Sequence, residues 1–330
     1  MMRGMDARRA IEVTTFGECL ASFVADPPGP MAEASRFTRY VAGAEANVAV
    51  GLARLGHEAA FIGHVGADGF GTAIIRALRG EGVDVGHLTA VDDHRTGVMF
   101  RERRGLGAMD VIYYRSGSAG STLSVDDVER AAADGRFESR WVHLTGITPA
   151  LSESARAATS RARDLARASG AIVSLDINLR RRLWSEDEAA AVVRDLAAGV
   201  DVVFGSPDEL ALVVGVEAPS EELVAAVAQS GPHTVVAKLG HDGALAFEAG
   251  GDAIHEPGIA VSVVVDPVGA GDAFCAGFIA GRLDGVDLAA ALRMGNACGA
   301  LAVSTSGDQA GLPDRAELAR LLGGGPDTLR

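Results

Sequence analysis

The chain has 330 residues, of which 48% are hydrophobic, and a formal net charge of −14 at pH 7. A chain of this length and apolar content can bury a large core, and its even composition favours one large α/β domain over two. The negative charge gives the protein no field that attracts a polyphosphate backbone, so we expect no nucleic-acid partner. An anionic small substrate would have to be bound by locally placed arginines.

The three cysteines, Cys19, Cys275 and Cys298, are widely separated and lack metal-ligand spacing. We interpret them as reduced core residues of a cytoplasmic protein. No signal-peptide-like apolar stretch precedes residue 12, and no apolar run reaches membrane-spanning length. We therefore expect a cytoplasmic protein without a membrane anchor, in which residues 1–10 are disordered.

Strand-like apolar runs alternate with helical periods along the chain. The expected strands are 13–16, 59–62, 141–144, 171–175, 202–204 and 234–237. The expected helices are 46–55, 71–79, 152–168, 186–198, 221–229, 272–282 and 288–304. This alternation is typical of right-handed βαβ units, and it predicts a central, mainly parallel sheet flanked by helices.

Two stretches, at about residues 19–42 and 94–116, depart from this alternation. Within the second, Thr96–Arg101 and Asp110–Arg115 alternate polar and apolar side chains. Such alternation indicates half-solvated antiparallel strands, so we expect a small β-sheet that stands over the edge of the main sheet as a lid. Lid strands with open edges favour a homodimer or a higher homo-oligomer.

The most informative segment is Asp266–Gly281, in which a glycine-rich turn leads into an apolar helix. Gly269 and Gly271 let the backbone approach an anion, and the first amides of the helix lie at the positive end of its dipole. Asp272 is a poor phosphate ligand, but it is a suitable base for a hydroxyl that attacks a γ-phosphate. The alternative is an ordinary helix cap in which Asp272 stabilises the dipole.

Two other nucleotide-binding motifs are absent or incomplete. Lys238 is the only lysine in the sequence, and no Gly-x-x-x-x-Gly-Lys-Ser/Thr loop exists, so a P-loop nucleotidase is excluded. The run that begins at Gly269 lacks the third glycine of a dinucleotide fingerprint and comes late in the chain. A dehydrogenase therefore has little support, and failure to bind NAD would dismiss it.

The segment 266–281, together with residues 43–56 and 63–71, resembles the ribokinase (PfkB) family of carbohydrate kinases. The resemblance extends from about residue 12 to about residue 315. It implies a ribokinase-like fold with a β-sheet lid, and phosphoryl transfer from ATP to a sugar hydroxyl with Mg²⁺ and an optional monovalent cation. It also implies that Asp272 is the catalytic base. The implied anion hole consists of the amides of Gly269, Ala270, Gly271 and Asp272.

Four shorter segments, at residues 113–120, 144–151, 174–180 and 304–308, are similar to 2-keto-3-deoxygluconate kinases. This similarity implies ATP-dependent phosphorylation of the 6-hydroxyl of 2-keto-3-deoxygluconate, a sugar acid, to give 2-keto-3-deoxy-6-phosphogluconate. The implied substrate-binding residues are Gly43, Tyr113, Arg115, Ile147, Arg180, Asp272 and Asp308.

Physical reasoning on the lid and loop residues supports part of this assignment. Tyr113 and Arg115 are two residues apart, so they share one face of a strand. The guanidinium of an arginine fits a carboxylate, which a sugar acid carries and fructose or ribose does not. Without the resemblance, both residues would be interpreted as a solvent face. Arg180 belongs to a charge run, Arg180–Arg182, that would ordinarily be solvated, but it follows the C-terminal end of a strand, where α/β sheets bind ligands.

Lys238–Gly243 follows an expected strand and resembles the nucleotide loop of the family, although a plain hairpin turn is the alternative. Asn296 could equally cap or pack within its own helix. The implied nucleotide-binding residues are Asn178, Arg180, Lys238, Gly240, Gly243, Gly269, Gly271 and Asn296.

Two positions depart from the family pattern. Ser206 replaces the asparagine of an Asn-x-x-Glu pattern, whereas Glu209 remains and can order a water-bound Mg²⁺. Met99 stands where a lid tyrosine is expected, which leaves the finer sugar specificity open.

Several alternatives remain. Within the family, the chain could be a 2-keto-3-deoxygalactonate kinase, a fructokinase or a ribokinase. The last two would use neutral hydroxyl ligands in place of Arg115 and Arg180. In another class, the chain could be a non-catalytic ribokinase-like sugar-binding protein, but the presence of Asp272 within an intact anion-hole run opposes this.

Overall fold

The computed structural model describes residues 10–103 and 109–323. Disorder was expected for residues 1–10. Of these, all but Ala10 lie outside the described residues. In the part of the chain that the structure describes, nine strands form the larger sheet, in the order β13-β12-β11-β10-β9-β8-β1-β4-β5, and four form the smaller, in the order β3-β2-β6-β7.

The larger sheet is parallel apart from one edge. Its parallel strands are β1 (Val13–Glu18), β4 (Ala59–Gly66), β5 (Asp84–Val91), β8 (Trp141–Thr145), β9 (Ile172–Asp176), β10 (Val202–Gly205) and β11 (Thr234–Lys238). The antiparallel edge consists of β12 (Ala244–Glu248) and β13 (Ile254–Glu256). The predicted central parallel sheet is confirmed, and all six expected strands belong to it; β5, β12 and β13 were not among the expected strands.

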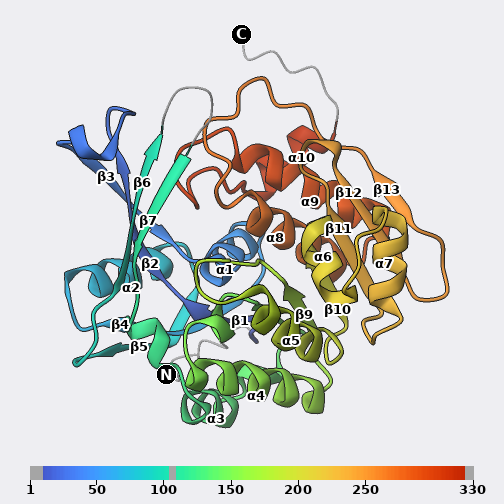
Figure 1. Cartoon of the computed structure of the whole chain (residues 1–330), viewed down its shortest axis with the longest axis horizontal. Helices are drawn as coiled ribbons and strands as arrows, with labels where there is room; N and C mark the ends of the chain where they lie inside the picture. The colour runs from blue at the N-terminus through green and yellow to red at the C-terminus, as the bar shows by residue number, and fades with distance from the viewer. Residues whose placement is uncertain (1–9, 104–108, 324–330) are drawn as a thin grey trace, which may run out of the picture.

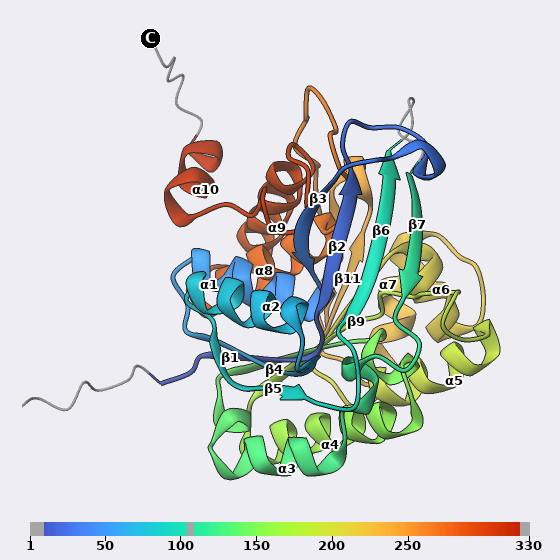
Figure 2. The same cartoon turned by 90° about the vertical axis from the view of Figure 1, so that its left-hand side faces the viewer.

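Helices cover both faces of this sheet (Figures 1 and 2). One face carries α1 (Ala44–Arg54), α2 (Gly69–Gly80), α8 (Ala270–Leu283) and α9 (Leu288–Ala302), against which α10 (Arg315–Leu322) packs. The other carries α3 (Val125–Ala133), α4 (Glu153–Ser169), α5 (Glu186–Ala197), α6 (Pro207–Val214) and α7 (Ser220–Ala228). Neighbouring residues of a strand point to opposite faces. Phe204 therefore joins the hydrophobic cluster under the first group, and Val203 joins the cluster under the second.

The seven expected helices are present, whereas α3, α6 and α10 were not expected. No helix in the described ranges combines the length and the apolar character that a membrane crossing requires.

The smaller sheet is the expected lid. Its strands are β2 (Leu20–Ala25), β3 (Phe37–Ala42), β6 (Gly97–Arg103) and β7 (Met109–Tyr114), and they rise beside the larger sheet (Figure 2). Met99 lies directly opposite Tyr113 in the β6–β7 pairing. The outer face is aromatic: the ring of Phe100 lies 5.3 Å from Phe23 and 5.8 Å from Tyr114. The lid thus has an apolar outer face and an inner face directed at the body of the protein.

Two contacts fix the position of helix α8, which carries Asp272. Its Phe278 lies edge-on to Phe204 of β10, with ring centroids 5.2 Å apart, and both rings are fully buried. On the side of α1, a Cβ atom at Gly51 would lie only 2.7 Å from the Cβ of Ala276. The glycine therefore allows the two helices to approach closely, and their N-terminal ends meet over the same region of the sheet.

We expect Phe278→Ala to lower the free energy of unfolding by about 3–5 kcal/mol, the usual loss when a buried phenylalanine is truncated. Urea denaturation followed by circular dichroism measures this quantity. Val263→Ala is the control, since Val263 is 64% exposed and should change stability by less than about 0.5 kcal/mol. Equal effects of the two substitutions would contradict the proposed anchoring of α8.

Candidate active site

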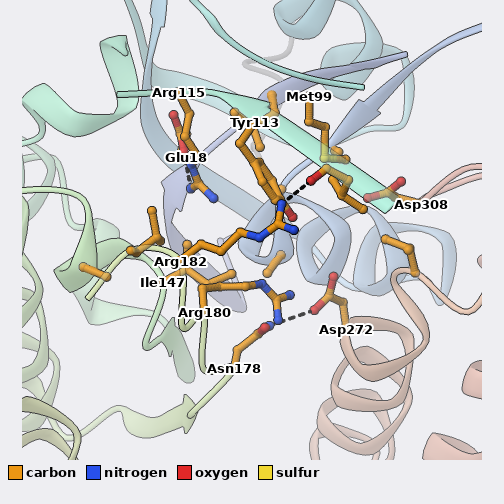
Figure 3. Close-up of a pocket in the computed structure, with 18 of the residues that line it drawn as sticks. Glu18, Met99, Tyr113, Arg115, Ile147, Asn178, Arg180, Arg182, Asp272 and Asp308 are labelled. Atoms are coloured by element: carbon orange, nitrogen blue, oxygen red, sulfur yellow. Dashed lines mark hydrogen bonds and ion pairs between the residues drawn. The ribbon is translucent and has the colours of Figure 1, made fainter. Parts of the chain in front are cut away.

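A cavity of about 1140 Å³ lies between the lid and the body of the protein (Figure 3). Its wall comes from lid strands β6 and β7, the start of α1, the loop after β9, and the turn before α8. All of the predicted substrate-binding residues line it: Gly43, Tyr113, Arg115, Ile147, Arg180, Asp272 and Asp308. The structure therefore brings together residues that are up to 265 positions apart in the chain (308 minus 43).

The glycine-rich turn before α8 has the geometry expected of an anion site. Gly269 is the N-cap residue, with φ of 83°, and a Cβ atom there would lie 2.8 Å from the carbonyl oxygen of Asp308. Both facts require glycine. The helix begins at Ala270, so its first amides have no carbonyl partner one turn earlier within the helix. Gly269 and Gly271 both line the cavity.

Asp272 is buried in the first turn of α8 and is held from two other elements. The Nδ2 atom of Asn47 donates to its Oδ2 at 2.8 Å, and the Nδ2 atom of Asn178 donates to its Oδ1 at 3.4 Å (Figure 3). Burial raises the pKa of Asp272, and the hydrogen bond from Asn47 opposes this effect. The carboxylate is therefore positioned by two asparagines from α1 and from the loop after β9.

Asn178 is placed by an unusual turn after β9. It has a positive φ of 42°, a conformation that asparagine tolerates better than most residues. The following amide, of Leu179, donates to Oε1 of Glu209 at 2.7 Å, while Oε2 of Glu209 accepts from the amide of Ser206 at 2.8 Å. Glu209 thus fixes the loop to the start of α6. Arg180, which is exposed, extends from this loop toward Asp272 (Figure 3).

The donor set of the cavity suits a metal that is held mainly by a substrate. In the described residues, no three His, Cys, Asp or Glu side chains are grouped so as to bind a metal ion. Glu209 lines the cavity, and both of its carboxylate oxygens already accept a backbone N–H. Mg²⁺ usually keeps several waters and binds one or two carboxylates plus phosphate oxygens. The residues present are compatible with that mode, with Glu209 acting through water.

Lys238 provides a fixed positive charge under the glycine-rich turn. Its Nζ atom lies 2.7 Å from both carboxylate oxygens of Asp176, and a Cβ atom at Gly271 would lie 3.3 Å from Nζ. Burial, the largest single effect, lowers the pKa of Lys238, but the charge and hydrogen bond of Asp176, together with smaller contributions from Cys275 and Glu209, raise it overall. The Cys275 thiol lies 3.7 Å from Asp176, and burial raises its pKa, so it is an unreactive core residue.

Three of the predicted nucleotide-binding residues, Gly240, Gly243 and Asn296, do not line the cavity. The run after Lys238 is a hairpin turn between β11 and β12, which was the alternative interpretation. The Nδ2 atom of Asn296 donates to the carbonyl oxygens of Glu256 and Pro257, at 3.0 and 3.1 Å. Nucleotide binding by these three residues stays a prediction.

Arg115 lines the cavity, but one of its nitrogens is already paired. Its Nη2 atom contacts the buried carboxylate of Glu18, which also accepts the hydroxyl of Ser118. The guanidinium lies 5.5 Å from the ring of Tyr113. Its buried Nε atom makes no hydrogen bond to any residue that the structure describes. Arg115 is therefore held by Glu18 and borders the cavity from the lid side.

Two residues in the Gly43–Gly56 motif were not predicted as site residues. Asn47 contacts Asp272, and its own Oδ1 accepts from Gln309 at 3.1 Å, which fixes the orientation of the amide. Glu45 is fully buried, accepts the hydroxyls of Thr145 and Thr148 at 2.7 and 2.6 Å, and has its pKa raised to about 7 by burial. Glu45 and Asn47 follow Gly43 at the start of the same helix, α1. This short spacing in the sequence could have identified both as site residues.

Arg182 was also missed as a site residue, although its side chain is 70% exposed, as the charge run predicted. It extends from the loop after β9 to the lid, where it donates to the carbonyl oxygen of Val111 (Figure 3). Its Nη2 atom lies 3.5 Å from the carboxylate of Asp110. This arginine thus connects strand β7 to the body of the protein at the mouth of the cavity.

Comparison with known proteins gives the family. Residues 10–315 match the pfkB family carbohydrate kinases. The 2-dehydro-3-deoxygluconokinase of Bacillus subtilis (strain 168) is 39% identical over 315 residues, which cover 94% of this chain and 95% of that protein. The enzyme of the same name from Thermoproteus tenax is 39% identical over 321 residues, which cover 96% and 95%.

Solved structures agree with this match. The 2-dehydro-3-deoxygluconokinase of Thermotoga maritima has a TM-score of 0.84 at 28% identity, covering 96% of this chain and all (100%) of its own. The fructokinase of Vibrio cholerae O395, solved with fructose, ADP and calcium ion, has a TM-score of 0.80 at 31% identity, covering 94% and 99%. Because sequence and fold agree over nearly the whole chain, the protein belongs to the pfkB family of carbohydrate kinases.

Proposed function

We propose that this kinase transfers the γ-phosphoryl group of ATP to the 6-hydroxyl of 2-keto-3-deoxygluconate, also called 2-dehydro-3-deoxygluconate. The product is 2-keto-3-deoxy-6-phosphogluconate. The observation that carries the proposal is the placement of the buried carboxylate of Asp272 opposite the guanidinium of Arg180 in one cavity. A base and an anion-binding group facing each other suit a substrate with a hydroxyl at one end and a carboxylate at the other. The identity to the two 2-dehydro-3-deoxygluconokinases supports the same substrate.

The sugar-acid end is assigned to two arginines. Among the residues described, Arg180 makes only a long hydrogen bond, 3.5 Å, to the carbonyl oxygen of Leu179, so its guanidinium is available to a carboxylate. The second arginine, Arg115, lines the same cavity from the lid side. Tyr113 and Ile147 complete the wall between these charges. The substrate carboxylate would lie between the lid and the loop after β9, with the terminal hydroxyl directed at Asp272.

The phosphoryl-transfer end is assigned to Asp272 and the turn before it. Asp272 accepts the proton of the attacking hydroxyl, while Asn47 and Asn178 hold its carboxylate in place. The amides of Gly269, Ala270, Gly271 and Asp272, together with Lys238, stabilise negative charge on the transferring group. A bound Mg²⁺ would neutralise the β- and γ-phosphate oxygens, with Glu209 contacting its water shell. A monovalent cation remains part of the proposal as an optional cofactor.

We further propose that the protein acts in the cytoplasm as a homodimer or a higher homo-oligomer. The outer face of the lid supports self-association, since the exposed side chains of Ile112 and Tyr114 and of the neighbouring Phe70 of α2 lie beside the half-buried rings of Phe23 and Phe100. Large apolar patches on a soluble protein commonly mark an interface.

The principal alternatives are another PfkB substrate, namely 2-keto-3-deoxygalactonate, fructose or ribose. The galactonate epimer carries the same carboxylate, so the arginines do not discriminate against it. Met99, which lies opposite Tyr113, is the residue that bears on the choice between the two epimers. ADP release measured against a panel of sugars and sugar acids tests all of these substrates together. A preference for fructose or ribose would overturn the proposed sugar-acid substrate.

We expect Asp272→Asn to lower kcat by about 10² to 10⁴, the range for a positioned base, while the fold and ATP binding persist. Asp287→Asn is the matched control, because Asp287 caps the start of α9 and asparagine also caps helices well. Since the base must be ionised and the pKa of Asp272 is raised, kcat/KM should fall with decreasing pH at a value above about 3.9. Retention of more than half of the wild-type turnover would exclude Asp272 as the base.

Removal of divalent metal by EDTA should abolish phosphoryl transfer, and Mg²⁺ should restore it, because the β- and γ-phosphate charges need neutralisation. Glu209→Gln should raise the Mg²⁺ concentration required for half-maximal rate. Glu188→Gln, on exposed Glu188, should not. A magnesium titration of initial rates measures both effects. Full activity in metal-free buffer would contradict the metal requirement, and an unchanged titration for Glu209→Gln would remove Glu209 from the metal site.

Arg180→Met should lower kcat/KM for 2-keto-3-deoxygluconate by at least about tenfold, because a hydrogen bond to a charged group is worth about 1.5–3 kcal/mol. For fructose, which has no carboxylate, the change should be much smaller. Arg181→Met is the control, since the Nε atom of Arg181 pairs with exposed Glu186 at 2.6 Å. Equal losses for the acid and the neutral sugar would show that Arg180 does not bind the carboxylate.

A further inference from the structure

Arg101 belongs to the lid, but its guanidinium pairs with two carboxylates outside the lid. It belongs to strand β6, is 0% exposed, and lines the cavity. Its Nη1 atom lies 3.1 Å from Oδ2 of Asp266, and its Nη2 atom lies 2.8 Å from Oδ1 of Asp308. A fully buried arginine is costly unless it is paired, so these two carboxylates are essential partners.

The same two aspartates shape the glycine-rich turn. Oδ1 of Asp266 accepts from the amide of Val268 at 3.1 Å, and Oδ2 accepts from the amide of Gly307 at 3.1 Å. The carbonyl oxygen of Asp308 lies so close to Gly269 that a Cβ atom there would be 2.8 Å away. Asp266 and Asp308 therefore hold both chain segments that meet at Gly269, the residue that caps α8.

The pairing also links the sugar side to the phosphate side. Met99, two residues before Arg101 on β6, lies opposite Tyr113, so this part of the strand also belongs to the wall assigned to the sugar. A strand is a stiff element, and its position over the cavity determines whether Arg101 can reach Asp266 and Asp308. The contact thus joins an element that covers the sugar to the turn that stabilises the phosphoryl group.

We propose that Arg101 is a positioning residue that couples occupancy of the sugar site to the geometry of the anion hole, through Asp266 and Asp308. The proposal rests on the proposed phosphoryl transfer at Asp272, although not on which sugar is the substrate. With β6 seated over a sugar, Arg101 holds the turn around Gly269 in the arrangement seen here. Sugar and nucleotide should therefore strengthen each other's binding, and this coupling is reciprocal.

The test measures the dissociation constant of AMP-PNP with Mg²⁺ by calorimetry, with and without saturating sugar. The sugar is whichever member of the ADP-release panel has the highest kcat/KM, so an error in the proposed substrate does not affect the outcome. In the wild type, the sugar should tighten AMP-PNP binding by at least about fivefold. In Arg101→Met, the effect should fall below about twofold. The variant should also lose most of its kcat, whereas its KM for the sugar at saturating ATP should rise by no more than the coupling factor that is lost.

Two further variants complete the test. Arg39→Met removes an exposed arginine from lid strand β3 and should keep the wild-type coupling. Arg101→Lys keeps the positive charge, and it should fold even if loss of a buried arginine unfolds Arg101→Met. A lysine cannot span both carboxylates, so Arg101→Lys should retain only part of the coupling.

The proposal would be overturned by a wild type without coupling or by an Arg101→Met variant that couples as the wild type does. If Arg101→Met does not fold, wild-type coupling in Arg101→Lys would overturn it. A raised sugar KM as the only defect would also do so.

Discussion

The hydrogen bond between Asn47 and Asp272 joins the first turns of two helices that are more than 200 residues apart, and the rest of the site depends on that junction. It forms because Gly51 lets α1 approach Ala276 of α8 closely, and because the rings of Phe274 and Phe278 seat α8 against Phe204. Both helix starts then lie under the lid, where the buried carboxylate of Asp272 faces the cavity. A close contact between Gly51 and Ala276, four residues after Asn47 and Asp272, thus determines where Asp272 lies.

The sequence predicted the central sheet and the cavity wall well. Six of the seven parallel strands have a short apolar run, which local pattern detects, and the segment around Gly269 combines glycines, an acid and an apolar helix. The lid was predicted from alternation alone, in Thr96–Arg101 and Asp110–Arg115. Strand β13 has only three residues, too few to show a period, and β5 is half-exposed with an irregular pattern, so neither was expected.

Contacts between side chains of distant segments could not be predicted from local sequence pattern. Arg115 was predicted as a free carboxylate ligand, but nothing in its neighbourhood along the chain indicates that Glu18 pairs with it. Arg182 is solvated, as its charge run predicted, but only the folded chain brings Val111 within its reach. Asp176 and Lys238 are 62 residues apart and meet because β9 and β11 flank β10 in the parallel sheet. Such pairings follow from the order of strands, which no single segment specifies.

The buried charges of the cavity follow one rule: each buried cation has a carboxylate of its own. Lys238 has Asp176, Arg115 has Glu18, and Arg101 has Asp266 and Asp308. A buried ion pair contributes little net stability, because desolvation offsets the attraction, but it holds its charges in fixed positions. Fixed charges need no reorganisation when negative charge develops in a transition state. Arg180 differs, since it is exposed and hydrogen-bonds only weakly to its own loop among the residues described.

This difference separates the two tasks of the site. Phosphoryl transfer is the same for every sugar kinase, so the charges that serve it can be held permanently by internal carboxylates. Recognition of one sugar acid needs a charge whose partner arrives with the substrate. Glu45, whose pKa burial raises to about 7, limits the negative charge that such a substrate meets, because it holds a proton over part of the neutral range. The cavity is therefore suited to an anionic sugar beside the carboxylate of Asp272, although the whole protein carries a net charge of −14.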